Sequence, residues 1–414
     1  MFIKTIEIKN LIVYTKSFTE EEIKIIKKKL KSYNIYFLIP DGEDTPYYIE
    51  KDDNVIFERL RDRILEYQNL LQNTINEAGI PSYQWVMISK DKEQIKYAIK
   101  QPIGTILISN SEFEYKDIGY LPDMKIDNVN QIEEKLTKNT GYFSEVCSTL
   151  ISKDISYGNE GSFFHFNVDR EGIVFRVAAL GRYFKTTHDY FNCHQLSNRI
   201  RKSKFDFKSQ LNLFASLFNP VIEIIHKQHP VNGVTRVPSR PNKVDRFKEL
   251  VQIISGKNQI KDYSNILTCN INYPPHKELN SNQRFQNVKD VFSVNTSIDK
   301  DHIVIIDDVI VSGATLFEAA KALYLAGASK VTAVVLGVNQ FPTAFTYSNT
   351  QCPVCEGQMI LKFNSKDNSA FYGCENFSKN NCRHSESFLV GWHNILRRNS
   401  IDVNKEISED SLFF

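Results

Sequence analysis

Two adjacent aspartates, Asp307 and Asp308, follow an apolar run in the stretch HIVIIDDVIVSGATLFEAA, residues 302–320. Neighbouring like charges repel each other, so something else must usually make such a pair worth keeping. The next residues, VSGAT at 311–315, form a loop of small and hydroxyl residues that opens a helix. The N–H groups and the dipole at a helix N-terminus both favour phosphate. A ribose 5-phosphate, with one phosphate and a pair of hydroxyls, fits both features.

Four of the seven cysteines lie in CPVCEGQMILKFNSKDNSAFYGCENFSKNNC, with the spacing C-x2-C, eighteen residues, C-x7-C. Paired thiolates on two knuckles give the tetrahedral all-sulfur set that structural zinc accepts. His384 is an alternative to the last cysteine, and four unconnected buried cysteines are the remaining interpretation. We predict a zinc ribbon closed by the short strands MILKF and SAFYG. Its ligands are Cys352, Cys355, Cys374 and Cys382.

The composition is that of an ordinary globular protein, with 42% hydrophobic and 24% charged residues among 414. The 51 Lys and Arg nearly balance the 49 Asp and Glu, so any basic patch for nucleic acid must be local. No segment approaches about 18 consecutive apolar residues, and the opening MFIKTIEIKN lacks the long apolar core of a signal peptide. We therefore expect a cytoplasmic protein, in which clustered cysteines favour metal over disulfides.

Alternating strand-like and helix-like runs over the first ~130 residues predict a parallel, three-layer α/β domain. Thr19 and Glu22 form a capping box at the start of one helix. One long helix is expected from Asp53 to Ala78, ending at Gly79. The runs YQWVMIS, DKEQIKYAIK and GTILIS then continue as strand, helix and strand.

From about residue 141 the pattern changes, and the two alternating runs around DREG predict a β-hairpin. GVTRVPSR is expected as a strand that enters a Pro/Arg loop, and VDRFKELVQIIS as a helix. YPPHKELNSNQRFQNVKDVFSV has few apolar anchors and is expected as a long mobile loop. The acid-pair strand, a helix that stops at Gly327 and the strand KVTAVVLGV follow.

VIIDDVIVSGATL resembles the thirteen-residue ribose-phosphate signature of type I phosphoribosyltransferases. The order of RVPSRP, DRFKELVQII, HKELNSNQRFQNVKDVFSV, the signature and LYLAGASKVTAVVL is similar to that of the ComF-type branch of this family. The similarity covers about residues 215–338. The family usually has two threonines where this chain has Val311 and Ser312, so one hydroxyl donor of order ~1 kcal/mol is lost.

This resemblance implies phosphoribosyl pyrophosphate and magnesium as ligands. Asp307 and Asp308 would accept hydrogen bonds from the ribose hydroxyls and help to hold the metal. Closure of a mobile loop would keep water from the ribosyl cation. The resemblance further implies Val311, Ser312, Gly313, Ala314 and Thr315 for the 5-phosphate, Pro238, Ser239 and Arg240 for the pyrophosphate, and Lys277 and Arg284 for closure over the leaving group.

The stretch from YQWVMIS to NQIEEKL, residues 83–136, resembles the C-terminal half of haloacid dehalogenase-like (HAD) hydrolases. Such enzymes need an Asp-x-Asp pair after their first strand, as nucleophile and acid/base with magnesium. Here LIVYTKSFT places Tyr14 and Lys16 at that position. We therefore expect an inactive, Rossmann-like scaffold.

CPVC with FYGCENF resembles the small zinc fingers at the C-termini of type IA topoisomerases, which bind single-stranded DNA, although the C-x7-C spacing is slightly longer here. Aromatic side chains of the ribbon could stack on bases while basic ones meet phosphates, or the aromatics could form the core of so small a module. They are Phe363, Phe371, Tyr372 and Phe377, with Lys362, Lys366, Lys379 and Arg383. A helical face with Arg199, Arg201, Lys202 and Lys204 is expected to be a solvated surface that could extend a nucleic-acid track.

We therefore predict an α/β chain of three modules: a degenerate HAD-like domain over residues 1–138, a ComF-like type I phosphoribosyltransferase domain over 139–345, and a zinc ribbon over 346–390, followed by a tail over 391–414. The favoured function is a phosphoribosyltransferase in a DNA-linked process, such as DNA uptake, defence or nucleotide metabolism. The alternative is a non-catalytic, nucleic-acid-binding regulator that senses phosphoribosyl pyrophosphate or nucleotides. Only the enzyme releases pyrophosphate when an acceptor is present. The sequence leaves the acceptor and the oligomeric state open, a homo-oligomer included.

Overall fold

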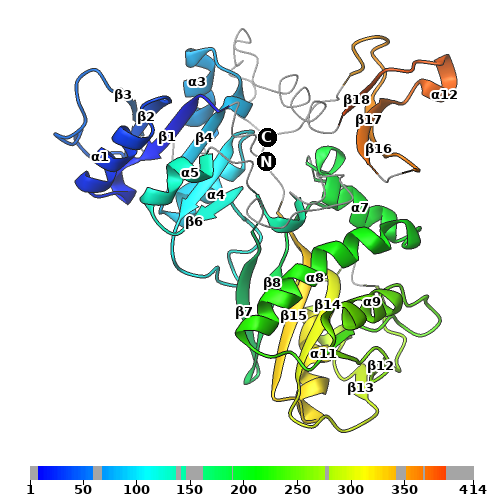
Figure 1. The fold of residues 1–414 in the computed structure, drawn as a ribbon. Coiled ribbons are helices and arrows are strands. Elements are labelled where there is room, and N and C mark those ends of the chain that lie inside the picture. The colour runs from blue at the N-terminus through cyan, green and yellow to red at the C-terminus, as the bar shows by residue number, and fades with distance from the viewer. Residues whose placement is uncertain are drawn as a thin grey trace.

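The computed structural model describes residues 8–58, 68–136, 141–145, 162–188, 190–275, 279–341, 351–366 and 369–387. These residues form a mixed α/β structure, in which one part is built on a parallel sheet of six strands (Figure 1). None of the helices in these ranges is long and apolar enough to cross a membrane. Lys277 and the tail at 391–414 lie outside the described residues.

The first sheet has six strands in the order β3–β2–β1–β4–β5–β6, and all five neighbouring pairs are parallel. Its strands and helices are β1 (Asn10–Tyr14), α1 (Glu20–Lys29), β2 (Asn34–Ile39), β3 (Asn54–Phe57), α3 (Gln68–Ala78), β4 (Trp85–Ser89), α4 (Lys92–Ile99), β5 (Gly104–Ile108), β6 (Met124–Ile126) and α5 (Ile132–Leu136). Every residue of β1, β4 and β5 is buried, as expected where helices cover both faces of a parallel sheet.

The start of α1 confirms the predicted capping box, because Thr19 and Glu22 each bond the other's main-chain N–H. The single long helix predicted from Asp53 to Ala78 is wrong at its beginning. Residues 54–57 form β3, which pairs in parallel with β2. The helix end is correct, since α3 stops at Ala78 and Gly79 has a positive φ of 65°.

The second sheet has the order β11–β10–β14–β15–β8–β7, with β9 also beside β15, and only β7 runs antiparallel to its neighbour. Its strands and helices are β7 (Phe164–Arg170), β8 (Ile173–Ala179), β9 (Arg182–Tyr183), α7 (Gln195–Ser203), α8 (Leu211–Gln228), β10 (Gly233–Arg236), α9 (Lys248–Asn258), β11 (Lys261–Asp262), β14 (His302–Ile310), α11 (Ala314–Leu325) and β15 (Lys330–Asn339). The predicted hairpin is confirmed as β7 and β8, whose turn has positive φ at Glu171 and Gly172.

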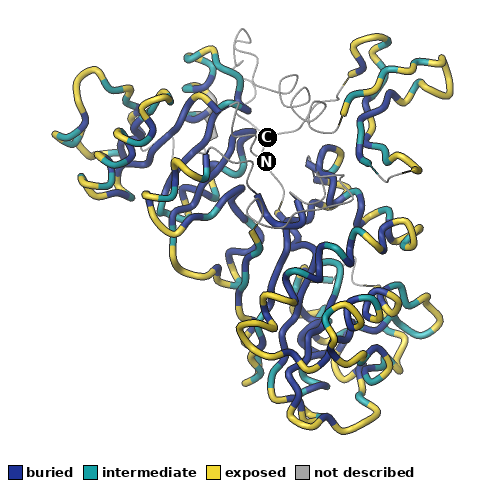
Figure 2. Tube along the Cα trace, in the orientation of Figure 1, coloured by how far each residue is buried: buried dark blue, intermediate teal, exposed yellow. Residues whose placement is uncertain are grey.

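The central strand β14 is buried on both faces, because its side chains alternate between two cores. Ile303 and Ile305 pack in a cluster with α11, whereas Val304 and Ile306 pack in another with α8 and α9. Figure 2 shows this strand region as a continuous buried centre beneath more exposed helices. The acid pair thus follows a segment with no freedom to shift its register.

The segment 273–294, predicted as a long loop, is in fact partly regular where it is described. It contains α10 (Ser281–Asn287) and β13 (Phe292–Val294), and β13 pairs with β12 (Leu267–Cys269). Asn280 and Gln283 form a second capping box at the start of α10.

A three-stranded antiparallel sheet lies near the C-terminus. It consists of β16 (Met359–Phe363), β17 (Ala370–Cys374) and β18 (Ser385–Ser387), with the short helix α12 (Phe377–Asn380) between the last two strands. The strands predicted at MILKF and SAFYG are therefore present.

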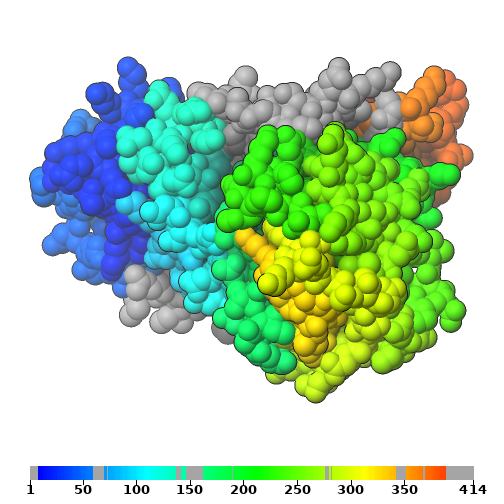
Figure 3. Space-filling view, turned by 60° about the horizontal axis from the view of Figure 1, so that its bottom comes forward, coloured from blue at the N-terminus to red at the C-terminus, as the bar shows by residue number. Residues whose placement is uncertain are grey.

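One hydrophobic cluster joins the two parts of the chain. Phe113, Ile118 and Leu121, from the segment between β5 and β6, pack in the same cluster as β14, β15 and α11. Arg182 of β9 binds Asp123 at 2.8 Å and Glu145 at 2.9 Å, and each of the three side chains is only 3% exposed. Figure 3 shows the two parts pressed directly against each other.

Candidate functional site

The acid pair lies near the carboxyl end of β14, between the parallel neighbours β10 and β15. The strand continues past the two aspartates and ends at Ile310. The main-chain N–H of Asp308 donates to Asp307 Oδ1 at 2.8 Å. Arg246 Nη2 donates to Asp308 Oδ2 at 3.3 Å.

Asp307 does not ionise as an ordinary carboxyl. Its burial, followed by the charge of the neighbouring Asp308, raises the pKa of Asp307 to about 8. The pair therefore carries less than two full negative charges near neutral pH. A cation or a set of hydroxyl donors at this position would favour the ionised form.

The loop that follows β14 closes onto the N-terminus of α11. Gly313 is the N-cap and has φ of 66° and ψ of −1°, a left-handed conformation that a glycine adopts without strain. Val311 is exposed, whereas Gly313 and Ala314 are buried. The loop thus presents main-chain groups at the start of a twelve-residue helix.

One pocket of about 150 Å³ brings most of the predicted residues together. Asp307, Arg284 of α10 and all five predicted loop residues line it, together with Val309, Ile310 and Leu316. Asp308 is not among its lining residues, because its carboxylate faces Arg246.

The predicted second loop lies at the end of the neighbouring strand β10 but outside the lining of this pocket. Val237 N donates to Ile306 O at 3.2 Å, which ties the start of this loop to β14. Ser239 Oγ donates to Val244 O at 3.1 Å, and Arg240 Nη1 donates to Tyr273 O at 2.9 Å. Pro238 lies between them in the chain. Parallel strand ends meet at one edge of a sheet, so this loop and the acid pair share an edge.

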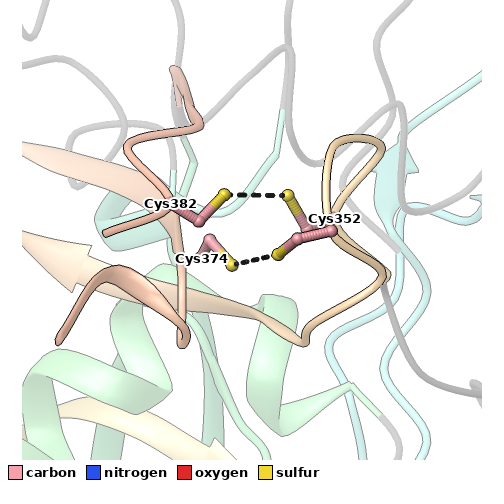
Figure 4. A group of neighbouring side chains, drawn as sticks. Cys352, Cys374 and Cys382 are labelled. Atoms are coloured by element: carbon pink, nitrogen blue, oxygen red, sulfur yellow. Dashed lines mark hydrogen bonds between the residues drawn. The ribbon is translucent and has the colours of Figure 1, made fainter. Parts of the chain in front are cut away.

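The four clustered cysteines come together as predicted, with all Sγ atoms within 4.8 Å of one another. The Sγ atoms of Cys352 and Cys382 are 3.8 Å apart, and those of Cys355 and Cys374 are 3.4 Å apart. Figure 4 shows the labelled Cys352 and Cys382 facing each other across the group. This set could hold a metal ion. His384 lies outside it and pairs with Glu386 at 3.0 Å.

Main-chain and amide N–H groups surround the sulfurs. Asn376 N donates to Cys374 Sγ at 3.4 Å, and Asn376 Nδ2 donates to Cys355 Sγ at 3.5 Å. The Asn376 amide, followed by the Gly357 main chain, lowers the pKa of Cys355 to about 6, whereas burial raises that of Cys374 to about 12. Thiolates are the metal-binding form, and four of them in one place require a compensating cation.

The ribbon's aromatic side chains divide into two groups. Tyr372 is buried and donates its hydroxyl to Cys193 O at 3.1 Å, and Phe363 lies beneath the guanidinium of Arg199 at 4.4 Å from the ring centroid. These two rings attach the ribbon to the second part of the chain. Phe377 is 51% exposed, and Phe371 is partly exposed.

The basic face of α7, which was expected to be solvated, is therefore only partly exposed to solvent. Arg199 of α7 is buried, and its Nε donates to Gln195 Oε1 at 2.8 Å, whereas Arg201 and Lys204 are exposed. Burial lowers the pKa of Arg199 to about 9. The Phe363 ring of the ribbon packs against Arg199 on this face of α7.

Two polar side chains at the site were not predicted from the sequence. Arg246 contacts Asp308 from a position 62 residues earlier in the chain. Tyr115, from the first part, donates its hydroxyl to the main-chain oxygen of Ser312 across 197 residues. A basic residue just before a helix and a tyrosine in a loop are both common, so neither carried a recognisable signal.

A scan against protein-family models finds no match to this chain, and no curated protein sequence matches it.

Proposed function

We propose that this chain binds magnesium–phosphoribosyl pyrophosphate and acts as a ComF-like phosphoribosyltransferase. The observation that carries the proposal is the pocket that joins Asp307 to the Val311–Thr315 loop at the N-terminus of α11. A half-buried carboxylate and a set of main-chain N–H donors are what the hydroxyls and the phosphate of a ribose 5-phosphate need.

Each group of residues would have one role. The loop would bind the 5-phosphate through main-chain N–H groups, with the hydroxyls of Ser312 and Thr315 as further donors. Asp307 and Asp308 would accept hydrogen bonds from the ribose hydroxyls, and their negative charge would favour the positive charge that develops on the sugar. Arg284, which lines the same pocket, would meet the pyrophosphate.

The acid pair also fits a magnesium ion, because Mg²⁺ prefers oxygen ligands and is usually held by one or two carboxylates and the phosphates of its substrate. Such an ion would neutralise the charge on the departing pyrophosphate. The loss of a hydroxyl at Val311 leaves the main-chain donors of the loop unchanged.

Calorimetric titration tests this function directly. The protein should bind phosphoribosyl pyrophosphate with magnesium, and ribose 5-phosphate with or without it. A screen of nucleobases for pyrophosphate release then separates the enzyme from the sensing regulator, which binds without turnover. If the protein binds neither ligand, both the enzyme and the sensing regulator are excluded as its function.

We assign zinc to the four cysteines. A tetrahedral site with Zn–S bonds of about 2.3 Å places its sulfurs about 3.8 Å apart, close to the separations of 3.8 and 3.4 Å in two of the sulfur pairs. The N–H donors at Asn376 would stabilise the thiolates. Zinc in this position would have a structural role, since four protein ligands leave no open coordination position.

Single-stranded DNA remains the proposed partner of the ribbon, but fewer of the aromatic side chains predicted to stack on bases are accessible to it. Phe371 and Phe377 remain accessible there, and the Lys362 ammonium lies 5.9 Å from the Phe377 ring centroid. A titration of labelled single-stranded oligonucleotides against wild type and Phe377→Ala tests this face. Equal affinity of the two proteins would exclude Phe377 as a stacking residue.

The first part is proposed to be a degenerate HAD-like scaffold. Its strand order, in which β1 lies next to both β2 and β4, is that of a doubly wound sheet. Tyr14 and Lys16 occupy the positions of the Asp-x-Asp pair, and neither side chain carries a carboxylate; Tyr14 is buried, and Lys16 pairs with Glu43 at 3.0 Å. Assays with generic phosphate esters and magnesium should show no hydrolysis by this part. Turnover that survives Asp308→Asn but disappears when the first part is mutated would contradict this assignment.

A further inference from the structure

Tyr115 connects the first part of the chain to the candidate phosphate loop. It lies in the segment between β5 and β6, and its hydroxyl donates to the main-chain oxygen of Ser312. The same hydroxyl lies 3.3 Å from the position that a Cβ on Gly313 would take. Its ring packs near Phe166, with centroids 6.0 Å apart. Burial raises the pKa of Tyr115 to about 12, so the hydroxyl remains a donor throughout the physiological pH range.

Because the peptide bond is trans, the contact between Tyr115 and the Ser312 carbonyl also fixes the direction of the Gly313 N–H. In the unit that joins Ser312 to Gly313, the C=O and the N–H point in opposite directions. Tyr115 holds the C=O, so the N–H of Gly313 points away from Tyr115. The pocket is lined by Ser312 and Gly313 but not by Tyr115, which places Tyr115 behind the loop.

Without this hydrogen bond, the peptide unit is free to rotate and to present its carbonyl oxygen to the pocket. A carbonyl dipole in that orientation repels an anion, whereas an N–H attracts it. The hydrogen bond from Tyr115 therefore determines whether the pocket faces the positive N–H end or the negative C=O end of this peptide dipole.

The segment that carries Tyr115 is itself fixed to the second sheet. Phe341 N donates to Gly119 O at 2.9 Å, and Gln340 Oε1 accepts from Leu121 N at 3.0 Å. Gly119 packs so closely that a Cβ there would meet the Phe341 ring at 2.2 Å. These contacts leave little freedom for the segment to move relative to the loop.

We propose that Tyr115 is a positioning residue for the phosphate loop: it orients the Ser312–Gly313 peptide so that the loop can bind the 5-phosphate group of a phosphoribosyl ligand. The inference rests on the proposed function and extends it, because the first part then contributes to ligand binding without touching the ligand.

The test compares Tyr115→Phe with Tyr324→Phe in the full chain. Tyr324 also donates its hydroxyl to a main-chain carbonyl, that of Val174 at 3.0 Å, and accepts from Val331 N at 3.1 Å, but it lies far along α11 from the loop. Both variants should lower the melting temperature slightly. Only Tyr115→Phe should weaken the binding of ribose 5-phosphate, by roughly three- to tenfold, the scale of one hydrogen bond.

The outcomes are distinct. Equal affinity of Tyr115→Phe and wild type, with a lowered melting temperature, would make the tyrosine merely structural and overturn the inference while the proposed function remains. Equal weakening in both variants would also overturn it. Failure of the wild type to bind ribose 5-phosphate would overturn the inference together with the proposed function.

A spectroscopic signal of the peptide itself gives an independent readout. Glycine-selective ¹⁵N labelling reports only the 17 glycine amides of the chain, and the signal absent from Gly313→Ala identifies Gly313. Saturating ribose 5-phosphate should shift this amide strongly in wild type and in Tyr324→Phe. The shift should be smaller in Tyr115→Phe, even when the ligand is saturating. A full-sized shift in that variant would contradict the positioning role.

Discussion

Replacement of Asp307 by asparagine should stabilise the free protein and weaken ligand binding. The side chain is nearly isosteric, and an asparagine Oδ1 can still accept the N–H of Asp308 that now binds Asp307 at 2.8 Å. What the change removes is the ionisable group, whose pKa is raised to about 8 by burial and by the charge of Asp308. A group that strains the free protein but serves a ligand is a common compromise at functional sites.

The pH dependence of this effect follows from proton counting. An aspartate in the unfolded chain ionises near pH 4, whereas Asp307 in the folded chain keeps its proton up to about pH 8. Between these values the folded state binds more protons, so the free energy of unfolding of wild type falls as the pH rises. The asparagine variant has no such dependence at this position, and its advantage should therefore grow from pH 5 to pH 8.

The magnitude has an upper limit. About four pKa units at 1.36 kcal/mol each give roughly 5 kcal/mol, and the entry of water around a partly exposed pair reduces this to an expected gain of about 1–3 kcal/mol at pH 8. Urea denaturation of wild type and Asp307→Asn at pH 5 and pH 8, without ligand, measures the difference.

Asp301→Asn is the matched control, because its pKa is shifted the other way. Burial opposes ionisation of Asp301, but hydrogen bonds from Tyr263 and Lys261 outweigh it and hold the pKa below its usual value. The stability from this carboxylate is present above its unfolded pKa and is lost only as the pH falls through the folded one. Asp301→Asn should thus destabilise at both pH values. If Asp307→Asn instead destabilised the protein equally at pH 5 and pH 8, the acid pair would be structural and the reasoning about its purpose wrong.

Three further changes test other parts of the molecule. Cys352→Ser should lose one equivalent of zinc, measured by elemental analysis, and should loosen the ribbon without unfolding the rest; wild type that contains no zinc would contradict the metal assignment. Thr315→Val should weaken the binding of ribose 5-phosphate by roughly three- to tenfold, with or without magnesium, at unchanged thermal stability; unchanged affinity in calorimetry would remove this hydroxyl from the site. Arg182→Met should lower the unfolding free energy by about 3–5 kcal/mol, because it removes the guanidinium that balances the buried carboxylates of Asp123 and Glu145; a loss below ~1 kcal/mol in urea denaturation would show that water or another cation replaces it.

Local signals predicted many elements of this fold but not all of them. Thr19 and Glu22 marked a helix start, and the residues around Gly172 marked a hairpin, because capping and turn chemistry act within a few residues. The segment 54–57 was assigned to a helix because four residues carry too little periodicity to identify a strand. Its strand character comes from pairing with β2, which is a tertiary interaction. The capping box at Asn280 was present in the sequence and was missed because the segment is so polar.

The residues of the candidate site likewise divide into those predicted from local sequence and those brought in by the fold. Asp307, the Val311–Thr315 loop and the four cysteines are recognisable because their chemistry depends on close spacing in the chain. Arg246 and Tyr115 reach the site only through the fold, over separations of 62 and 197 residues. The contact between Phe363 and Arg199 could not be foreseen either, since it depends on where the ribbon docks.

The buried charges of Arg182, Asp123 and Glu145 help to explain how Tyr115, in the segment between β5 and β6, can orient a loop of the second sheet. Burial alone would raise the pKa of Glu145, but Arg182 outweighs this and holds it well below its usual range, so Glu145 stays ionised. Buried ion pairs add little net stability compared with apolar packing of the same volume, because desolvation offsets much of their attraction. Their hydrogen bonds, however, have narrow distance and angle requirements, which apolar contacts lack. The apolar core between the two sheets can hold them together, and the charge cluster then restricts them to one relative position. Asp123 lies at the end of the segment that carries Tyr115, so this ion pair fixes the segment eight residues from the tyrosine whose hydroxyl binds the Ser312 carbonyl oxygen.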